Sequence, residues 1–129
     1  IKVMIVGFDK ETCPLTDYEL GVLLPVLVRG LIPKNGHNRA VKNGDIVRAL
    51  RPNYKITEAR VRKIINHIRT HDLVPGLIAT SDGYFIAETE AELIEYEESL
   101  KGRENAICEV RRSIARQRRM LYEAARHNE

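Results

Sequence analysis

Residues 57–70, TEARVRKIINHIRT, combine cationic and aliphatic side chains at the spacing of an α-helix. The aliphatic residues recur three and four positions apart, which predicts one buried helix face: Val61, Ile64, Ile65 and Ile68. The opposite arc carries no acid and is expected to hold Ala59, Lys63, Asn66 and Thr70, with Arg62 and His67 beside it. Guanidinium, ammonium and amide groups in this arrangement can bind nucleic-acid bases and phosphates.

The residue types within this helix predict two kinds of DNA contact. Arg62 and Lys63 suit guanine, Asn66 suits adenine, and the small Ala59 would permit a close approach. Three further cations are expected to contact phosphates: Lys55, Arg60 and Arg69. Thr57 is an additional candidate contact. The alternative is a helix whose cations are simply solvated.

A β-hairpin is predicted after this helix. Two short β-type runs, 77–80 and 84–87, flank Ser81-Asp82-Gly83, a sequence that tolerates the backbone of a tight turn. Ser81 and Tyr84 are candidate donors to phosphate, although Tyr84 is equally suited to packing. A hairpin that grips phosphate usually carries Lys or Arg near its tip, so Asp82 argues against such a contact.

Capping chemistry predicts the first helix. Thr16 and Glu19 form a capping box. Pro25 should kink the helix because its ring opposes a carbonyl of the preceding turn, and Gly30 with Pro33 should end it. The buried face is expected to hold Leu20, Leu23, Leu24, Leu27 and Val28.

Three further helices follow from similar signals. Asn43 or Asp45 is expected to cap a short helix. Thr57 should cap the basic helix, which is predicted to run to about His71, and a second capping box at Thr89 should start the last helix.

The resulting order is helix, short helix, basic helix, hairpin and long helix. With the segments RVRKIINHIR and LIATSDGYFIA, this order resembles the winged helix-turn-helix domain of small phage and prophage proteins, most without an assigned activity. The resemblance covers roughly residues 15–115. It implies that the third helix lies in the DNA major groove while the hairpin, or wing, contacts the backbone or the minor groove.

The expected fold is therefore mainly α with a small β-hairpin wing. We expect a strand or tail over residues 1–14, a winged helix-turn-helix domain over 15–88, and a long C-terminal helix over 89–129.

The long helix carries apolar residues at every seventh position, which is typical of a coiled coil. One seam is aliphatic: Leu93, Leu100, Ile107, Ile114 and Leu121. The second seam is mixed and adds Tyr96 and Val110 to the predicted dimerisation surface, beside Arg103 and Gln117. Glu residues crowd the first turns and Arg residues the last, which favours antiparallel pairing of two chains. The alternatives are a helix that packs along its own domain and an Arg cluster that contacts nucleic acid.

Composition argues against several other classes of protein. The 129 residues carry a net charge of +3, with two basic regions around an acidic one. Cys13 and Cys108 fit neither a disulfide framework nor a zinc site, which favours a reducing, cytoplasmic setting. No run approaches the ~20 apolar residues of a membrane span, and we expect no cleavable leader. His67 and His71 have a spacing that can hold a metal but lack further ligands, so we expect no metal, cofactor or catalytic set.

The sequence thus predicts a homo-oligomer that binds double-stranded DNA, as a transcription regulator or a phage replication accessory. The alternative is a protein-interaction adaptor that uses the same scaffold without contacting nucleic acid. An RNA or single-strand binder is a third and weaker hypothesis, because the two Phe and five Tyr leave few rings for base stacking.

Overall fold

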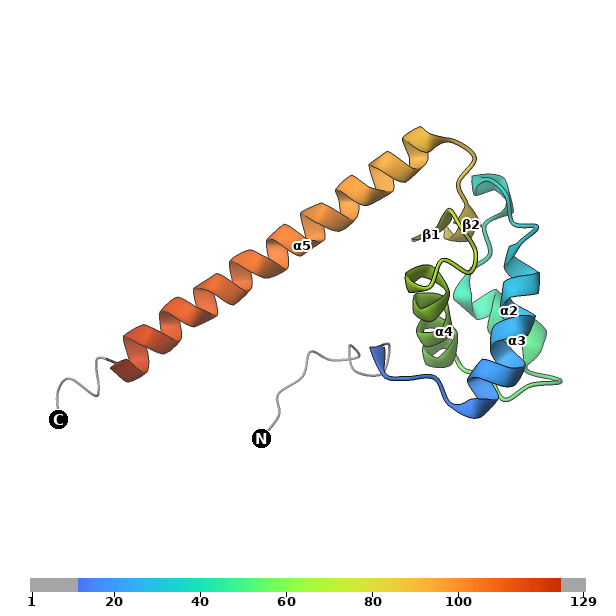
Figure 1. Ribbon diagram of the computed structural model, residues 1–129, viewed down its shortest axis with the longest axis horizontal. Coiled ribbons are helices and arrows are strands. Elements are labelled where there is room, and N and C mark those ends of the chain that lie inside the picture. The colour runs from blue at the N-terminus through green and yellow to red at the C-terminus, as the bar shows by residue number, and fades with distance from the viewer. Residues whose placement is uncertain (1–11, 124–129) are drawn as a thin grey trace. The chain divides into compact units, whose positions relative to one another are not determined.

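The computed structural model describes residues 12–123, and the chain divides into two units, Ile1–Glu90 and Ala91–Glu129 (Figure 1). The prediction of a strand or tail over residues 1–14 lies largely outside the described residues. The elements, in chain order, are η1 (Glu19–Leu23), α2 (Leu24–Leu31), η2 (His37–Arg39), α3 (Asn43–Leu50), α4 (Glu58–Thr70), β1 (Leu77–Thr80), β2 (Gly83–Ile86), α5 (Glu90–Arg118) and η3 (Arg119–Glu123). The predicted mainly helical fold with a small hairpin and a long C-terminal helix is confirmed.

The first helix of the chain, made of η1 and α2, begins with the predicted capping box. The Thr16 amide donates to Glu19 Oε1 at 2.8 Å, and the Glu19 amide donates to Thr16 Oγ1 at 3.2 Å. Pro25 then falls in the first turn of α2, where a missing amide is tolerated. The turn before Pro25 is the π-helix η1, which is wider than an α-helical turn. This widened turn is the irregularity that the structure has where a kink was predicted.

Helix α4 lies at the centre of the hydrophobic core, as its periodicity predicts. Its four aliphatic residues are at most 1% exposed, and η1, α2 and α3 pack around them: Val61, Ile64, Ile65, Ile68, Leu23, Leu27, Leu31, Ile46 and Val47. The prediction that Leu20 shares the buried face is wrong, since Leu20 is 46% exposed. The π-helix changes the angular spacing of the residues before Pro25 relative to those after it.

The two middle helices start differently from each other. Thr57 caps α4 as predicted, accepting a hydrogen bond from the Arg60 amide at 3.2 Å. The predicted side-chain cap of α3 is wrong, because Lys42 is the N-cap residue and makes no side-chain cap bond. The Asn43 side chain instead donates to the Glu58 carbonyl oxygen at 3.2 Å and to the Tyr84 hydroxyl at 3.0 Å. It therefore ties α3 to the start of α4 and to the hairpin.

The predicted hairpin is confirmed, and strands β1 and β2 pair antiparallel. Its turn is one residue shorter than predicted, because Gly83 pairs with Thr80 as the first residue of β2. Gly83 has φ +120°, and a Cβ there would lie 2.5 Å from the Val41 carbonyl oxygen, so the position requires glycine. On its other side β2 forms isolated bridges, antiparallel between Val41 and Tyr84 and parallel between Asn35 and Ile86. The chain before α3 thereby adds a short third strand position to the hairpin.

Helix α5 begins at Glu90 and continues for 29 residues, close to the long helix predicted. None of its residues is buried. No helix in the described part of the chain combines the length and the apolar run that crossing a membrane would require.

Candidate nucleic-acid interface

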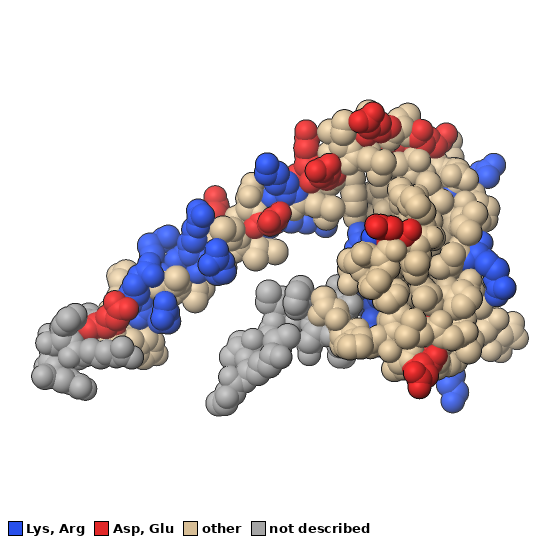
Figure 2. All heavy atoms as spheres, in the orientation of Figure 1, with Lys and Arg blue, Asp and Glu red and all other residues tan. Residues whose placement is uncertain are grey.

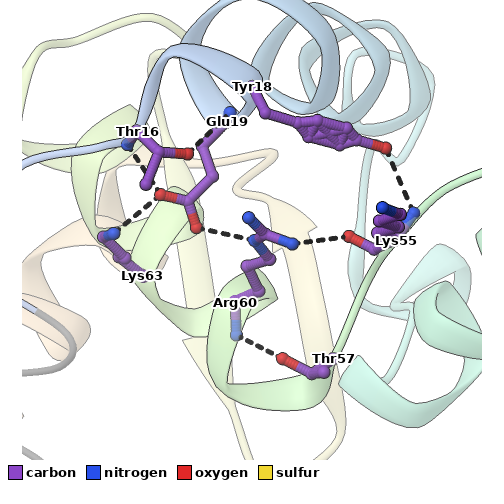
Figure 3. A network of polar contacts seen from close by, with 7 residues as sticks. All are labelled: Thr16, Tyr18, Glu19, Lys55, Thr57, Arg60 and Lys63. Carbon is purple, nitrogen blue, oxygen red and sulfur yellow. Dashed lines mark hydrogen bonds and ion pairs between the residues drawn. The ribbon is translucent and has the colours of Figure 1, made fainter.

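Glu19 organises the cationic side of α4 (Figure 3). Its Oε2 accepts a hydrogen bond from Arg60 Nε at 2.9 Å, and its Oε1 accepts one from Lys63 Nζ at 2.7 Å. The Glu19 side chain is 3% exposed, that of Lys63 12% and that of Arg60 29%. One carboxylate thus completes the cap of the first helix and holds two cations of α4.

The charges of this cluster stabilise one another. Burial alone would raise the pKa of Glu19, but hydrogen bonds from Lys63, the Thr16 amide and Arg60 outweigh burial and lower the pKa to about 2. The hydrogen bond to Glu19 in turn raises the pKa of Lys63. Both groups therefore stay ionised throughout the neutral range, and the cluster links the first helix to α4.

The prediction that Lys63 faces outward from α4 is wrong. Its ammonium group points to Glu19 and is mostly buried, so it is not placed for the predicted contact with a base edge. Arg60, expected at phosphates, is likewise bound to Glu19 and half-buried. The sequence did contain a signal, because a capping-box Glu has a second oxygen that can accept from a facing cation.

Other candidates on α4 differ in exposure. Ala59 and Arg62 are exposed, as expected for a contact surface, whereas Asn66 and Arg69 are half-buried. Lys63, Asn66, His67 and Thr70 line a hollow of about 370 Å³ together with the chain segment 12–15, which lies beside this part of the helix. The exposed outer face is therefore narrower than the sequence predicted and centres on Arg62.

The connection between α3 and α4 carries a second group of cations. The Lys55 amide donates to the Tyr18 hydroxyl at 3.1 Å, and Arg60 Nη1 donates to the Lys55 carbonyl oxygen at 3.0 Å (Figure 3). The Arg60 guanidinium lies 5.2 Å from the centre of the Tyr18 ring, a cation–π distance. These contacts fix the backbone from which the exposed Lys55 side chain projects.

A hollow of about 690 Å³ opens at this connection, lined by Tyr18, Arg60 and residues 51–55; we call it the basic hollow. Of its lining residues, the sequence had suggested only Lys55 and Arg60 as contact residues. Arg51 and Asn53 were missed because they lie outside the periodic helix, on a connection whose position depends on how α3 and α4 pack.

The hairpin offers fewer contacts than predicted. Tyr84 is 9% exposed and belongs to the core, and its hydroxyl accepts a hydrogen bond from the Asn43 side chain. Asp82 Oδ2 lies 2.8 Å from His37 Nε2 and forms a hydrogen bond with it, and both side chains are exposed. Ser81 at the tip is exposed.

The predicted DNA-contacting residues thus fall into two groups. Lys55, Thr57, Ala59, Arg62 and Ser81 are exposed; Arg60, Lys63, Asn66, Arg69 and Tyr84 are half-buried or buried.

His67 and His71 stack with ring centres 3.9 Å apart. Burial, together with the charge of His71, lowers the pKa of His67, which favours its neutral form. The described residues contain no group of three or more His, Cys, Asp or Glu side chains arranged to hold a metal.

Helix α5 carries an exposed apolar stripe along the predicted seams. Five of the predicted residues on α5 are between 42% and 62% exposed, and Tyr96 is half-buried: Leu93, Leu100, Ile107, Val110 and Ile114. The predicted Leu121 lies beyond α5, in η3, and is 67% exposed. Acidic side chains lie along the first part of the helix and basic ones along the later part (Figure 2).

The chain matches no family model, no curated protein and no solved structure.

Proposed function

We propose that the first unit is a winged helix-turn-helix domain that binds double-stranded DNA through Arg62 and the basic residues before α4. The order helix, bridge, helix, helix and hairpin supports this fold, with Val41 pairing to β2 as a short first strand. In this fold α4 is the helix that enters the major groove and the hairpin is the wing.

The observation that carries the proposal is the set of exposed cations around the start of α4. Arg51, Lys55 and Arg62 are exposed, and neither Arg51 nor Lys55 pairs with an acid in the described part of the chain. Arg62 lies one turn along α4 from Ala59, whose small side chain permits a close approach of a base pair. Lys55 projects from backbone that Tyr18 and Arg60 hold in place, so its position needs little further ordering on binding.

Fluorescence anisotropy with a labelled mixed-sequence duplex tests the proposal. Arg62→Ala should weaken binding about tenfold, the order of magnitude expected for loss of one arginine contact. The matched control is Arg29→Ala, which removes an exposed arginine from α2. Affinity should also fall steeply between 50 and 200 mM salt, because phosphate contacts release counterions. Absence of binding at low salt, or equal affinities of the two variants, contradicts the proposal.

We also propose that two chains associate through α5. An isolated helix gains little stability in water without a packed face, and the exposed stripe of α5 offers an aliphatic face along most of its length. Antiparallel pairing would place the acidic first half of each helix beside the basic second half of its partner, which supports a second copy as the occupant.

Sedimentation of matched variants tests this association. Ile107→Lys introduces a charge into the stripe and should reduce the mass to that of a monomer. Asn105→Lys introduces the same charge on the opposite side of the helix and should leave the dimer intact. A monomeric wild-type chain, or an Ile107→Lys variant of unchanged mass, rules out the association.

Orientation can be tested by cross-linking in a chain whose two native cysteines are replaced by Ser. Glu97→Cys and Gln117→Cys lie symmetrically about Ile107 in sequence. Antiparallel pairing centred on Ile107 predicts that a mixture of the two variants forms mainly the mixed disulfide. A predominance of identical pairs would instead indicate parallel helices.

One observation favours the adaptor as the alternative function. Glu19 binds two of the cations predicted for DNA, and the hairpin tip carries Asp82. A chain that forms the dimer but fails to bind any duplex at low salt would favour this alternative.

A further inference from the structure

The basic hollow brings several cationic side chains together. Three cations, Arg51, Lys55 and Arg60, face it together with Asn53, and no carboxylate lines it. Arg60 uses its Nε for Glu19 and one Nη1 proton for the Lys55 carbonyl, so three of its five N–H donors remain. The side chains of Arg51, Asn53 and Lys55 form no hydrogen bond with other described residues.

The hollow is held in shape by contacts that do not involve a ligand. Glu19 fixes Arg60, Arg60 fixes the carbonyl of Lys55, and the Tyr18 hydroxyl accepts from the amide of Lys55. Figure 3 shows this chain of contacts running from the first helix to the α3–α4 connection. These contacts already order the backbone of the hollow. An anion could therefore bind without the entropic cost of ordering that backbone.

The lining indicates more than a lone oxyanion. The hollow is an open surface depression in which aromatic rings lie beside the cations. Two tyrosines contribute to the lining; Arg60 occupies one face of Tyr18, and Tyr54 is half-buried. Cations beside an aromatic ring are the combination with which proteins bind a phosphate and the base attached to it.

We propose that the basic hollow binds a nucleotide unit, with its phosphate on Arg51 and Lys55 and its base or sugar against Tyr54. The same chemistry occurs in a free mononucleotide and in an unpaired nucleotide of a DNA strand. The strand-bound form rests on the DNA binding proposed above, whereas the free nucleotide would be a separate ligand of the first unit.

Nitrogen-15 NMR titrations of the full chain test the proposal with thymidine monophosphate, inorganic phosphate and a short oligothymidylate. Thymidine monophosphate should shift the amides of Arg51 and of residues 53–55, since Pro52 has no amide proton, and bind at least fivefold more tightly than phosphate. The double variant Arg51→Ala with Lys55→Ala should weaken its binding at least tenfold. The matched control, Arg29→Ala with Lys42→Ala, removes one exposed Arg and one exposed Lys elsewhere and should change affinity less than twofold.

The probes separate the two sources of ligand. Binding of oligothymidylate at least tenfold tighter than the mononucleotide, and loss of that binding in the double variant, supports a strand as the ligand. Equal affinities support the free nucleotide. The proposal is overturned if thymidine monophosphate leaves residues 51–55 unshifted, if phosphate binds as tightly, or if the double variant and its control bind alike.

Failure of this site and failure of DNA binding are distinguishable. Nucleotide binding at the basic hollow without any duplex binding keeps the hollow and removes the proposed DNA binding. Duplex binding that Arg62→Ala weakens, without nucleotide shifts at residues 51–55, keeps DNA binding and removes the hollow.

Discussion

Helices α4 and α5 are built from the same two kinds of side chain, aliphatic and cationic, yet they are used in opposite ways. Helix α4 buries its four aliphatic residues in its own unit, and two of its cations point back to Glu19. Helix α5 buries no residue and leaves its aliphatic stripe in solvent. Amphipathic pattern therefore identifies the face of a helix that needs a partner but does not identify the partner.

The partner differs because of what surrounds each helix in the chain. Helix α4 follows two helices and precedes a hairpin, and these elements together enclose its apolar face. Helix α5 follows the hairpin, and among the described residues of its unit, 91–123, no other long helix is present to cover it. The apolar stripe of α5 is thus covered by no other described element of its own unit.

The largest expected difference between the helices comes from one isoleucine in each. Ile64 is fully buried, so Ile64→Ala should reduce the free energy of unfolding by about 4 kcal/mol through lost burial and a cavity. Ile107 is 62% exposed, so Ile107→Ala should leave the stability of the first unit unchanged and weaken only association. Chemical denaturation at two protein concentrations measures both effects. Equal losses of stability in the first unit would contradict the contrast.

The next largest effect comes from Glu19, whose carboxylate binds Arg60 and Lys63 of α4. Glu19→Gln keeps the shape of the cap but leaves Lys63 mostly buried without a negative partner. We expect a loss of about 3 kcal/mol in unfolding free energy, as for one half of a buried pair. Glu104→Gln on α5 is the control, because Glu104 is exposed. A loss below 0.5 kcal/mol for Glu19→Gln would mean that the cluster contributes little to stability.

Acid should reproduce much of this loss. The pKa of Glu19 is about 2 in the folded chain against 4.5 for an unperturbed glutamate. Because the folded pKa is lowered, the stabilisation is present above pH 4.5 and is lost as the pH falls towards 2. The shift corresponds to a loss of up to about 3 kcal/mol.

Thermal unfolding of the wild type and of Glu19→Gln at pH 6, 4 and 2.5 isolates this carboxylate from the others. The difference between the two proteins should shrink as the pH falls. A difference that stays constant down to pH 2.5 contradicts the role assigned to the ionised Glu19.

The smallest expected effect is on the stability of α5. Gly102 lies inside this helix, and a Cβ there would meet no atom within 4 Å. Gly102→Ala should therefore stabilise the helix by about 1 kcal/mol through backbone propensity alone. Circular dichroism on heating should show the gain at the α5 transition. A destabilised dimer would instead indicate that the partner helix packs closely against this glycine.

Much of the fold could be predicted because it rests on local rules. The capping box at Thr16 and Glu19, the cap at Thr57, the buried face of α4 and the hairpin around Ser81-Asp82 each depend on residues close in sequence. The burial predicted for Leu20 and the helix cap predicted for Asn43 were wrong, because each depends on something that helical spacing and capping rules do not describe. A π-helix changed the spacing before Pro25, and Asn43 was drawn to Glu58 and Tyr84, residues far along the chain.

The candidate site was predictable only in part. Helical spacing correctly assigned Ala59 and Arg62 to the exposed side, because spacing alone sets which residues oppose the core. Spacing does not reveal that a carboxylate 44 positions earlier in the chain reaches Lys63. It is equally silent about Arg51 and Asn53, which acquire significance only as walls of the basic hollow.

Periodicity and capping by themselves determined the helices, the turn and the two apolar faces, because each depends on backbone geometry over a few residues. Only the tertiary structure decided which cations are exposed. A charged side chain adopts the conformation that best satisfies its hydrogen bonds, and for Arg60 and Lys63 that partner is Glu19, brought near by the packing of the first helix against α4.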